Sequence, residues 1–121
     1  RTKFSLTPIQ LCIDPVLVAR ALTNIVENAL HAMPTNGLLS IETTEDKDVV
    51  QIIIRDTGVG FDEATRLRIF EPYFSTKVTG TGLGMAIAKR NIELNGGSIF
   101  VDSASGIGTT VTVCFPSSSG D

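Results

Sequence analysis

The chain has 121 residues, of which 42% are hydrophobic, so it is long enough for one core and too short for two ordinary domains. Its 10 basic and 13 acidic residues give a net charge of -3, without the basic excess that usually accompanies nucleic-acid binding, so we expect no nucleic-acid partner. No apolar run approaches the roughly 20 residues that cross a bilayer, and the first residues lack a signal-peptide pattern, so we expect no membrane contact by this domain.

The two cysteines, Cys12 and Cys114, lie far apart in apolar runs that are typical of strands. Such residues are more often buried reduced thiols than a disulfide or a pair of metal ligands, which favours a cytoplasmic location. The sequence has no internal repeat and no linker, and only the tail at residues 117–121 has the composition of a disordered segment. We therefore expect one domain over residues 1–116.

The first half of the chain predicts an edge strand, a long helix and a hairpin. Residues 6–13 alternate loosely, and Asp14 followed by Pro15 is the pattern of a helix N-cap with proline in the first turn. The helix is expected to continue to about Met33. Residues 38–44 and 49–56 then have the composition of strands, joined by the acidic turn at residues 45–48.

The second half predicts a short helical stretch over residues 62–70, a glycine-rich loop, a helix over residues 84–95 and strands over residues 98–102 and 109–115. Strands of antiparallel type, grouped with a few helices, favour an α+β fold. We expect a two-layer sandwich in which a mixed, mostly antiparallel sheet carries helices on one face.

The long helix carries two stripes at spacings of three and four residues. One is apolar and predicts the core-facing side, and the other is polar. Asparagine inside a helix costs about half a kcal/mol relative to alanine, and a function would explain that cost. Because an amide oxygen is a suitable ligand for Mg²⁺, Asn28 is the candidate metal ligand. The alternative is an ordinary solvated helix face. The apolar stripe consists of Val18, Leu22, Ile25, Ala29 and Met33, and the polar stripe of Asn24, Glu27, Asn28 and His31.

A carboxylate ends the second hairpin strand. Alternation places Asp56 on the same face as the isoleucines at 52 and 54 and points Arg55 to the other face. A carboxylate at the edge of a core must find donors, and the exocyclic amine of a purine is one such donor. Gly58 and Gly60 follow and would let a flat ring lie against bare backbone. The alternative is a simple tight turn after a strand.

The loop Gly80-Thr81-Gly82-Leu83-Gly84 leads directly into the next predicted helix. Backbone N–H groups and a helix N-terminus then meet at one place, which is a ready site for phosphate. The spacing matches neither the Walker pattern nor the dinucleotide pattern. Residues 71–77 precede the loop and resemble a mobile lid with Lys77 as its cation. The alternative is a flexible connector.

Five segments in this order resemble the boxes of histidine kinase catalytic domains, in the superfamily that also contains gyrase, the heat-shock chaperone and the mismatch-repair ATPase. The resemblance covers nearly the whole chain and implies the Bergerat ATP-binding fold. The five segments are Asn24-Ile25-Val26-Glu27-Asn28-Ala29, Asp56-Thr57-Gly58-Val59-Gly60, Phe70-Glu71-Pro72-Tyr73-Phe74, Gly80-Thr81-Gly82-Leu83-Gly84 and Gly106-Ile107-Gly108-Thr109-Thr110.

The resemblance implies ATP and Mg²⁺ as cofactors and assigns roles by position. Asn28 would bind Mg²⁺, Asp56 would accept a hydrogen bond from the adenine amine, and Thr109 would support Asp56 through water. The backbone around Gly82 and Gly84 would bind phosphate. The full set of residues expected at the nucleotide is Asn28, His31, Asp56, Gly58, Gly60, Phe61, Phe74, Thr76, Lys77, Gly80, Thr81, Gly82, Leu83, Gly84 and Thr109.

The resemblance also implies the reaction. Gyrase-like members carry a catalytic glutamate where this chain has Asn24, so a water-activating hydrolase is not expected. By the same resemblance, Glu27 would orient the incoming histidine or accept its proton. The catalytic candidates are Glu27 and Asn24. His31, the chain's single histidine, lacks the histidine-acidic motif of an acceptor helix.

The expected function is therefore donation of the ATP γ-phosphate to a histidine on a separate dimerisation domain of the same kinase. A response regulator would take part indirectly, and the parent protein could be membrane-anchored. The sequence around the lid also resembles nitrogen-regulation-type kinases. The alternative is a nucleotide-dependent regulatory binding module or an anti-sigma-type serine kinase of the same superfamily.

Overall fold

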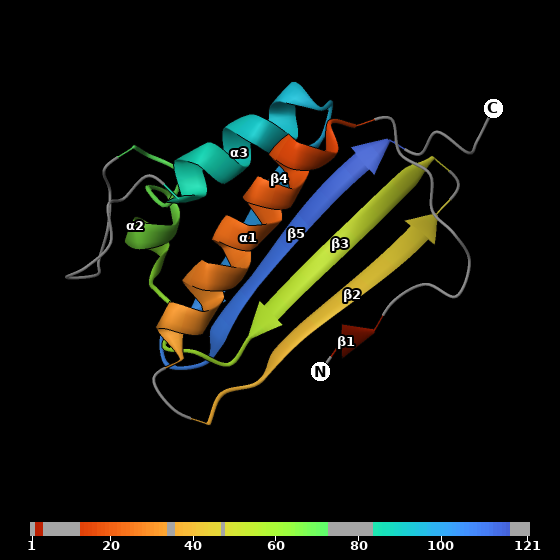
Figure 1. Ribbon diagram of the computed structural model, residues 1–121. Coiled ribbons are helices and arrows are strands. Elements are labelled where there is room, and N and C mark those ends of the chain that lie inside the picture. Colours follow the sequence, from red (N-terminus) through yellow and green to blue (C-terminus); the bar gives the residue numbers. More distant parts are fainter. Residues whose placement is uncertain (1, 4–12, 34–35, 47, 73–83, 117–121) are drawn as a thin grey trace.

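The computed structural model describes residues 2–3, 13–33, 36–46, 48–72 and 84–116 (Figure 1). Several expectations lie outside these residues. They are the greater part of the strand predicted at residues 6–13, Cys12, the tail at residues 117–121, and seven of the predicted nucleotide contacts, namely Phe74, Thr76, Lys77, Gly80, Thr81, Gly82 and Leu83.

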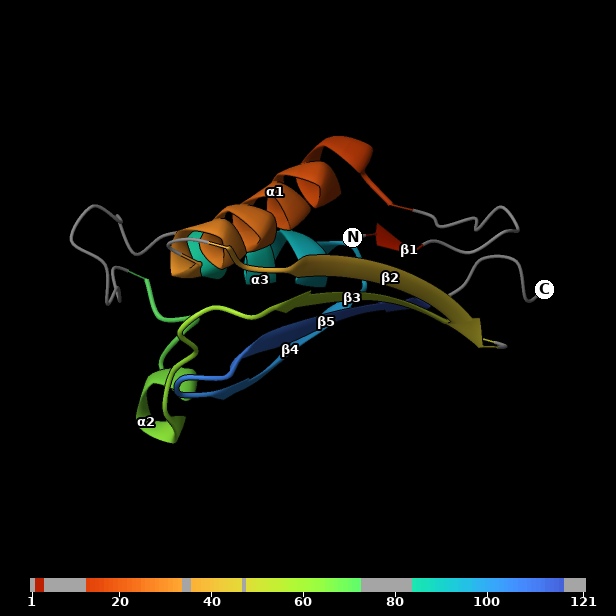
Figure 2. The ribbon, with the colours of Figure 1, turned by 90° about the horizontal axis from the view of Figure 1, so that it is seen from below.

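The fold has two layers. A five-stranded sheet has the order β1-β2-β3-β5-β4, in which β1 is parallel to β2 and the other neighbours are antiparallel. Helices α1 and α3 cover one face of this sheet, and the short α2 lies apart from them, at the end of the sheet beside β4 (Figures 1 and 2). This confirms the predicted α+β sandwich. The elements are β1 Thr2–Lys3, α1 Pro15–Ala32, β2 Leu39–Asp46, β3 Val49–Asp56, α2 Glu63–Arg66, α3 Gly84–Leu94, β4 Ser98–Ala104 and β5 Gly108–Pro116.

Helix α1 begins where the sequence predicts. The side chain of Asp14 accepts hydrogen bonds from the backbone N–H groups of Val16 and Leu17 at 3.0 and 3.2 Å, and Pro15 occupies the first turn without losing a hydrogen bond. The helix buries Val18, Ala21, Ile25 and Ala29. Ala21 was absent from the predicted apolar stripe, and Leu22 instead packs at the edge of the core.

The β2–β3 hairpin is longer than predicted. Ile41 faces Ile54 in the register, and the ladder continues until Asp46 faces Val49. Glu45 and Asp46, which were expected in the turn, are therefore strand residues, because pairing with β3 satisfies their backbone groups. The acidic turn was thus predicted to begin two residues too early, whereas β3 begins at Val49 as predicted.

The core lies between the helices and the covered face of β3, β4 and β5. Alternate residues of β5 point into it, and α3 contributes residues at helical spacing from the opposite side. Helix α3 ends at Leu94, and Gly96 follows in the left-handed region with φ of +78°, a conformation that glycine adopts readily at helix ends. The buried cluster comprises Val18, Ala21, Ile25, Ile54, Met85, Ala88, Ile92, Ile99, Val111, Val113 and Phe115.

The stretch predicted as helical over residues 62–70 is helical only at Glu63–Arg66. Asp62 caps this helix by accepting a hydrogen bond from the N–H of Thr65 at 2.9 Å. Turns follow as far as Pro72, because α2 buries none of its own side chains and has little apolar contact to extend it. None of the helices in the described part of the chain is long and apolar enough to cross a membrane.

Candidate nucleotide-binding site

Asp56 is the last residue of β3 and lies on the covered face of the sheet, as alternation predicts. Its side chain is 9% exposed, and Val50 and Ile54 on the same face are buried. Arg55 points to the opposite face, where its guanidinium contacts Glu42 at 3.3 Å. One carboxylate oxygen of Asp56 accepts a hydrogen bond of 2.8 Å from the N–H of Gly58, which fixes the orientation of the group.

Thr109 lies directly opposite Asp56 in the β3–β5 ladder and is also buried. Its hydroxyl is 2.8 Å from the hydroxyl of Ser103. Since Ser103 donates its own proton to the carbonyl of Gly108 at 3.1 Å, Thr109 is the donor of this pair. Thr109 therefore keeps lone pairs that can accept a hydrogen from a water, and that water could donate to Asp56.

Ser103 was not among the residues predicted from the sequence. Besides bonding Thr109, its hydroxyl accepts a hydrogen bond of 2.9 Å from the N–H of Phe61. It thus ties the loop after β3 to β4. Ser103 could not be identified without the β4–β5 register. That register sets Ser103 opposite Thr109, so that the two hydroxyls lie together on the covered face.

The glycines after Asp56 are explained by backbone packing. A Cβ added to Gly58 would lie 2.6 Å from the carbonyl oxygen of Ala32, the last residue of α1. Gly60 has φ of +62°, and a Cβ there would lie 2.1 Å from the carbonyl oxygen of Ala104. From the sequence we expected a flat ring against the bare backbone of these glycines, whereas in the structure each glycine has a backbone neighbour. Contact with a base stays a prediction.

The polar stripe of α1 divides into two pairs. Asn24 and Asn28 are half-buried, while Glu27 and His31 are exposed. The side-chain N–H₂ group of Asn24 donates a hydrogen bond of 3.2 Å to the carbonyl of Gly84, the first residue of α3. Asn28 lies one helical turn further along the same side of α1. The stripe is therefore directed toward the start of α3 and is not a solvated face throughout.

Helix α1 connects the two ends of the predicted site. Its last carbonyl, that of Ala32, accepts a hydrogen bond of 3.0 Å from the N–H of Val59, in the loop after Asp56. Further back, Asn24 contacts Gly84. Asp56, Asn28 and Gly84 are far apart in the sequence, and α1 brings them to one region of the molecule. Of the predicted glycine-rich loop, only Gly84 lies within the described residues.

A hollow of about 440 Å³ opens at the same end of the sheet but on the other side. Its lining includes Ser40, Arg55, Asp102 and Thr110, which occupy neighbouring positions on the uncovered face. Asp56, Ser103 and Thr109 also line this hollow, so it borders the predicted site at the end of β3.

Comparison with known proteins identifies the family. Residues 13–119 match the family described as histidine kinase-, DNA gyrase B-, and HSP90-like ATPase. The signal transduction histidine-protein kinase AtoS of Escherichia coli K12 is 40% identical over 104 residues, which cover 85% of this chain and 17% of AtoS. Sporulation kinase A of Bacillus subtilis 168 is 35% identical over 116 residues, which cover 96% of this chain and 19% of that kinase.

Solved structures agree. The mycobacterial sensor histidine kinase MprB superimposes with a TM-score of 0.85 at 29% identity, covering 96% of this chain and 80% of that chain. The catalytic domain of histidine kinase ThkA gives a TM-score of 0.84 at 28% identity, covering 95% and 76%. The chain spans about a fifth of the length of the curated relatives it matches. It belongs to the histidine kinase-, DNA gyrase B- and HSP90-like ATPase family, as an ATP-binding catalytic domain of the histidine kinase type.

Proposed function

We propose that this domain binds Mg·ATP and donates the γ-phosphate to a histidine on a separate dimerisation domain of the same kinase. The single observation that carries the proposal is the buried carboxylate of Asp56 at the end of β3. A buried carboxylate must accept hydrogen bonds, and the exocyclic amine of adenine donates one. The bond from Gly58 orients the carboxylate before the nucleotide arrives.

The described residues are compatible with Mg²⁺ held largely by its nucleotide. They contain no group of three or more histidine, cysteine, aspartate or glutamate side chains that could hold a metal by themselves. Mg²⁺ usually keeps several waters and takes one or two protein ligands together with substrate phosphates. The amide oxygen of Asn28 would be that protein ligand, and the ion would offset negative charge on the phosphates.

The start of α3 supports phosphate binding. The first backbone N–H groups of a helix have no partner within the helix, and its dipole favours an anion there. Asn24 places this helix start against α1, on the same stripe as Asn28. The phosphates of a nucleotide whose base lies at Asp56 would therefore reach the region between α1 and α3.

The transfer step needs an acceptor from another part of the protein. An imidazole nitrogen of the acceptor histidine attacks the γ-phosphorus, the bond to the β-phosphate oxygen breaks, and ADP leaves with the electron pair. The imidazole proton passes to a base. Glu27 is exposed on α1 beside Asn28, so an incoming histidine can reach it. The chain's own His31 is exposed on the same helix and is not the acceptor in this scheme.

The nucleotide proposal is tested by Asp56→Asn in calorimetric titration with Mg·ATP. An asparagine that keeps its bond from Gly58 would turn an NH₂ donor toward the adenine amine, so we expect affinity to fall by roughly 100-fold. Asp102→Asn is the matched control, because it removes an exposed carboxylate on the uncovered face, and it should bind as the parent does. Equal affinity of Asp56→Asn and the parent would refute the adenine contact.

The transfer proposal is tested with radiolabelled ATP. The domain alone should acquire no label, and adding a dimerisation domain with an exposed histidine should yield an acid-labile, base-stable phosphate. An acid-stable product would indicate a serine or threonine acceptor and the anti-sigma-type alternative. Label on His31 of the domain alone would refute the two-domain scheme.

A further inference from the structure

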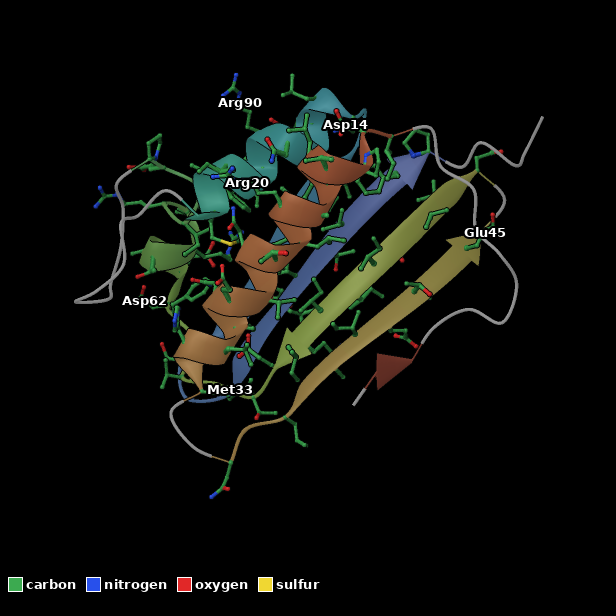
Figure 3. The ribbon with its side chains drawn as sticks, viewed as in Figure 1. Asp14, Arg20, Met33, Glu45, Asp62 and Arg90 are labelled. Atoms are coloured by element: carbon green, nitrogen blue, oxygen red, sulfur yellow. The ribbon has the colours of Figure 1, made fainter. Side chains whose placement is uncertain are left out.

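Three asparagine side chains connect α1 to α3, and their positions show that the two helices run antiparallel. Asn24 in the middle of α1 donates to the carbonyl of Gly84 at the start of α3. At the other end, the amide of Asn91 donates to the carbonyl of Leu17 at 3.1 Å. The side-chain oxygen of Asn95 accepts a hydrogen bond of 2.6 Å from the N–H of Asp14. Figure 3 shows Asp14 beside the C-terminal end of α3.

Directional hydrogen bonds add to apolar packing in fixing how far α3 lies along α1. Ala21 and Ala88 are completely buried in this part of the core, and such small side chains present a smooth surface. Apolar attraction has no direction, whereas a hydrogen bond weakens steeply with distance and angle. Asn91 is buried, and a buried amide is costly unless bonded, so its bond to Leu17 favours one register of the helices.

We propose that Asn24 is a positioning residue that fixes the first turn of α3 relative to Asn28, while Asn91 and Asn95 hold the other end of the helix pair. This inference rests on the proposed function. Asn28 lies four residues after Asn24 on the same side of α1, so the bond to Gly84 sets the separation of the metal ligand and the helix start. An error of about 1 Å in such a separation can cost 100-fold in rate.

The chemistry of Asn24 excludes a role as a proton acceptor. An amide is neutral across the physiological range and its nitrogen is a donor only. In the structure that donor is directed at the carbonyl of Gly84. Asn24 therefore acts through the position of α3, which refines the catalytic role expected from the sequence.

The test compares Asn24→Asp and Asn24→Ala with the matched control Thr23→Ala, an exposed neighbour on α1. Asparagine and aspartate have the same shape, but aspartate places an oxygen where the donor was, opposite the carbonyl oxygen of Gly84. Calorimetry measures the affinity of each protein for Mg·ATP and for AMP, which shares the base end and lacks the β- and γ-phosphates. Thermal unfolding of each variant is recorded in parallel.

We expect Mg·ATP affinity to fall about tenfold in Asn24→Ala and at least as much in Asn24→Asp, with AMP affinity within about twofold of the parent. Thr23→Ala should match the parent for both nucleotides. If Asn24→Asp does not fold, Asn24→Ala carries the test, because it introduces no repulsion.

Three results would overturn the inference. Undiminished Mg·ATP binding by Asn24→Asp would show that the bond to Gly84 does not set the affinity, and tighter binding would in addition indicate a metal ligand. Equal losses for ATP and AMP with a lowered unfolding midpoint would indicate a purely structural role. A parent domain that binds no Mg·ATP would refute the proposed function itself, whereas the first two results leave that function standing.

Discussion

Helix α1 meets the rest of the site in two places that are built differently. At its C-terminal end, the contact is between backbones, since the carbonyl of Ala32 faces Gly58 and bonds the N–H of Val59. Along its middle and N-terminal parts, the contact with α3 combines apolar packing with hydrogen bonds from amide side chains. The two kinds of contact differ in how well they tolerate substitution. A backbone contact leaves no room for an added atom, whereas a side-chain contact can be weakened in small steps.

The backbone contact extends beyond Gly58. Gly60 lies against the carbonyl of Ala104, and Gly108, with φ of +144°, lies against the carbonyl of Asp56. The N–H of Gly106 also donates to the carbonyl of Val59 at 2.6 Å. Close main-chain approach therefore helps to place the loops that surround Asp56, together with the bond from the N–H of Phe61 to Ser103.

The largest loss of stability is expected from Gly60→Ala, which tests the backbone contacts. The new Cβ would clash with the carbonyl of Ala104 and would occupy a left-handed backbone, so we expect a loss of about 3 kcal/mol or more. Gly96→Ala is the matched control, because Gly96 has φ of +78° but no atom within 4 Å of an added Cβ, and it should cost about 1 kcal/mol. Urea unfolding measures both. Similar losses would mean that φ alone matters and that the backbone approach does not.

The amide contacts should give a smaller loss. Asn91→Leu removes the donor to Leu17 and keeps the branched shape of the side chain, so we expect a loss of about 1 to 2 kcal/mol in urea unfolding. Arg90→Gln changes the exposed neighbouring residue and should stay within about 0.5 kcal/mol of the parent. A loss for Asn91→Leu as large as that for Gly60→Ala would erase the distinction between the two kinds of contact.

The smallest effect is expected at α2, which takes part in neither contact. The hydrogen bonds from Thr65 hold the pKa of Asp62 below its ordinary value of 3.8, and the ion pair with Arg66 lowers the pKa of Glu63. A pKa lowered by folding means that the stabilisation is present above the ordinary pKa and is lost as the pH falls through the folded-state value.

We therefore expect α2 to fray only in strong acid, while the contacts of α1 remain. Carboxyl carbon shifts, followed by NMR from pH 6 downward, should give a midpoint for Asp62 below 3.8. In Thr65→Pro, which removes the backbone donor, the midpoint of Asp62 should rise. A midpoint at or above 3.8 in the parent would contradict the capping interaction.

The sequence was sufficient for features that depend on local periodicity. Alternation along β3 placed Asp56 on the covered face, and the spacing of Asn24 and Asn28 placed both on one side of α1, as the structure has them. These patterns follow from the repeat of a strand or a helix. That repeat fixes which residues of one element share a face, whatever the rest of the chain does.

Features that depend on which elements meet were not predictable in the same way. Ser103 joins the site only because the β4–β5 register sets it opposite Thr109. Gly58 and Gly60 were read as space for a ring, because nothing local indicates that Ala32 and Ala104 approach them. The bond from Asn24 to Gly84 spans 60 positions, and only the packed helices create it. Helix α2 ends at Arg66 because none of its side chains is buried against the rest of the protein. Helix propensity along the sequence does not indicate such a lack of packing.

The bond between the N–H of Asp14 and the side chain of Asn95 fastens the place where the chain enters α1 to the end of α3. Asp14 also caps α1 through its carboxylate, so both helices share this one anchor. A pull or twist applied to the chain at this point loads α1 and α3 together. Helix α3 has 11 residues and is therefore roughly 16 Å long, and Gly84 lies at its opposite end. We therefore expect a displacement of this anchor to move α1 and α3 as one unit, with the bond from Asn24 keeping Gly84 in place relative to Asn28.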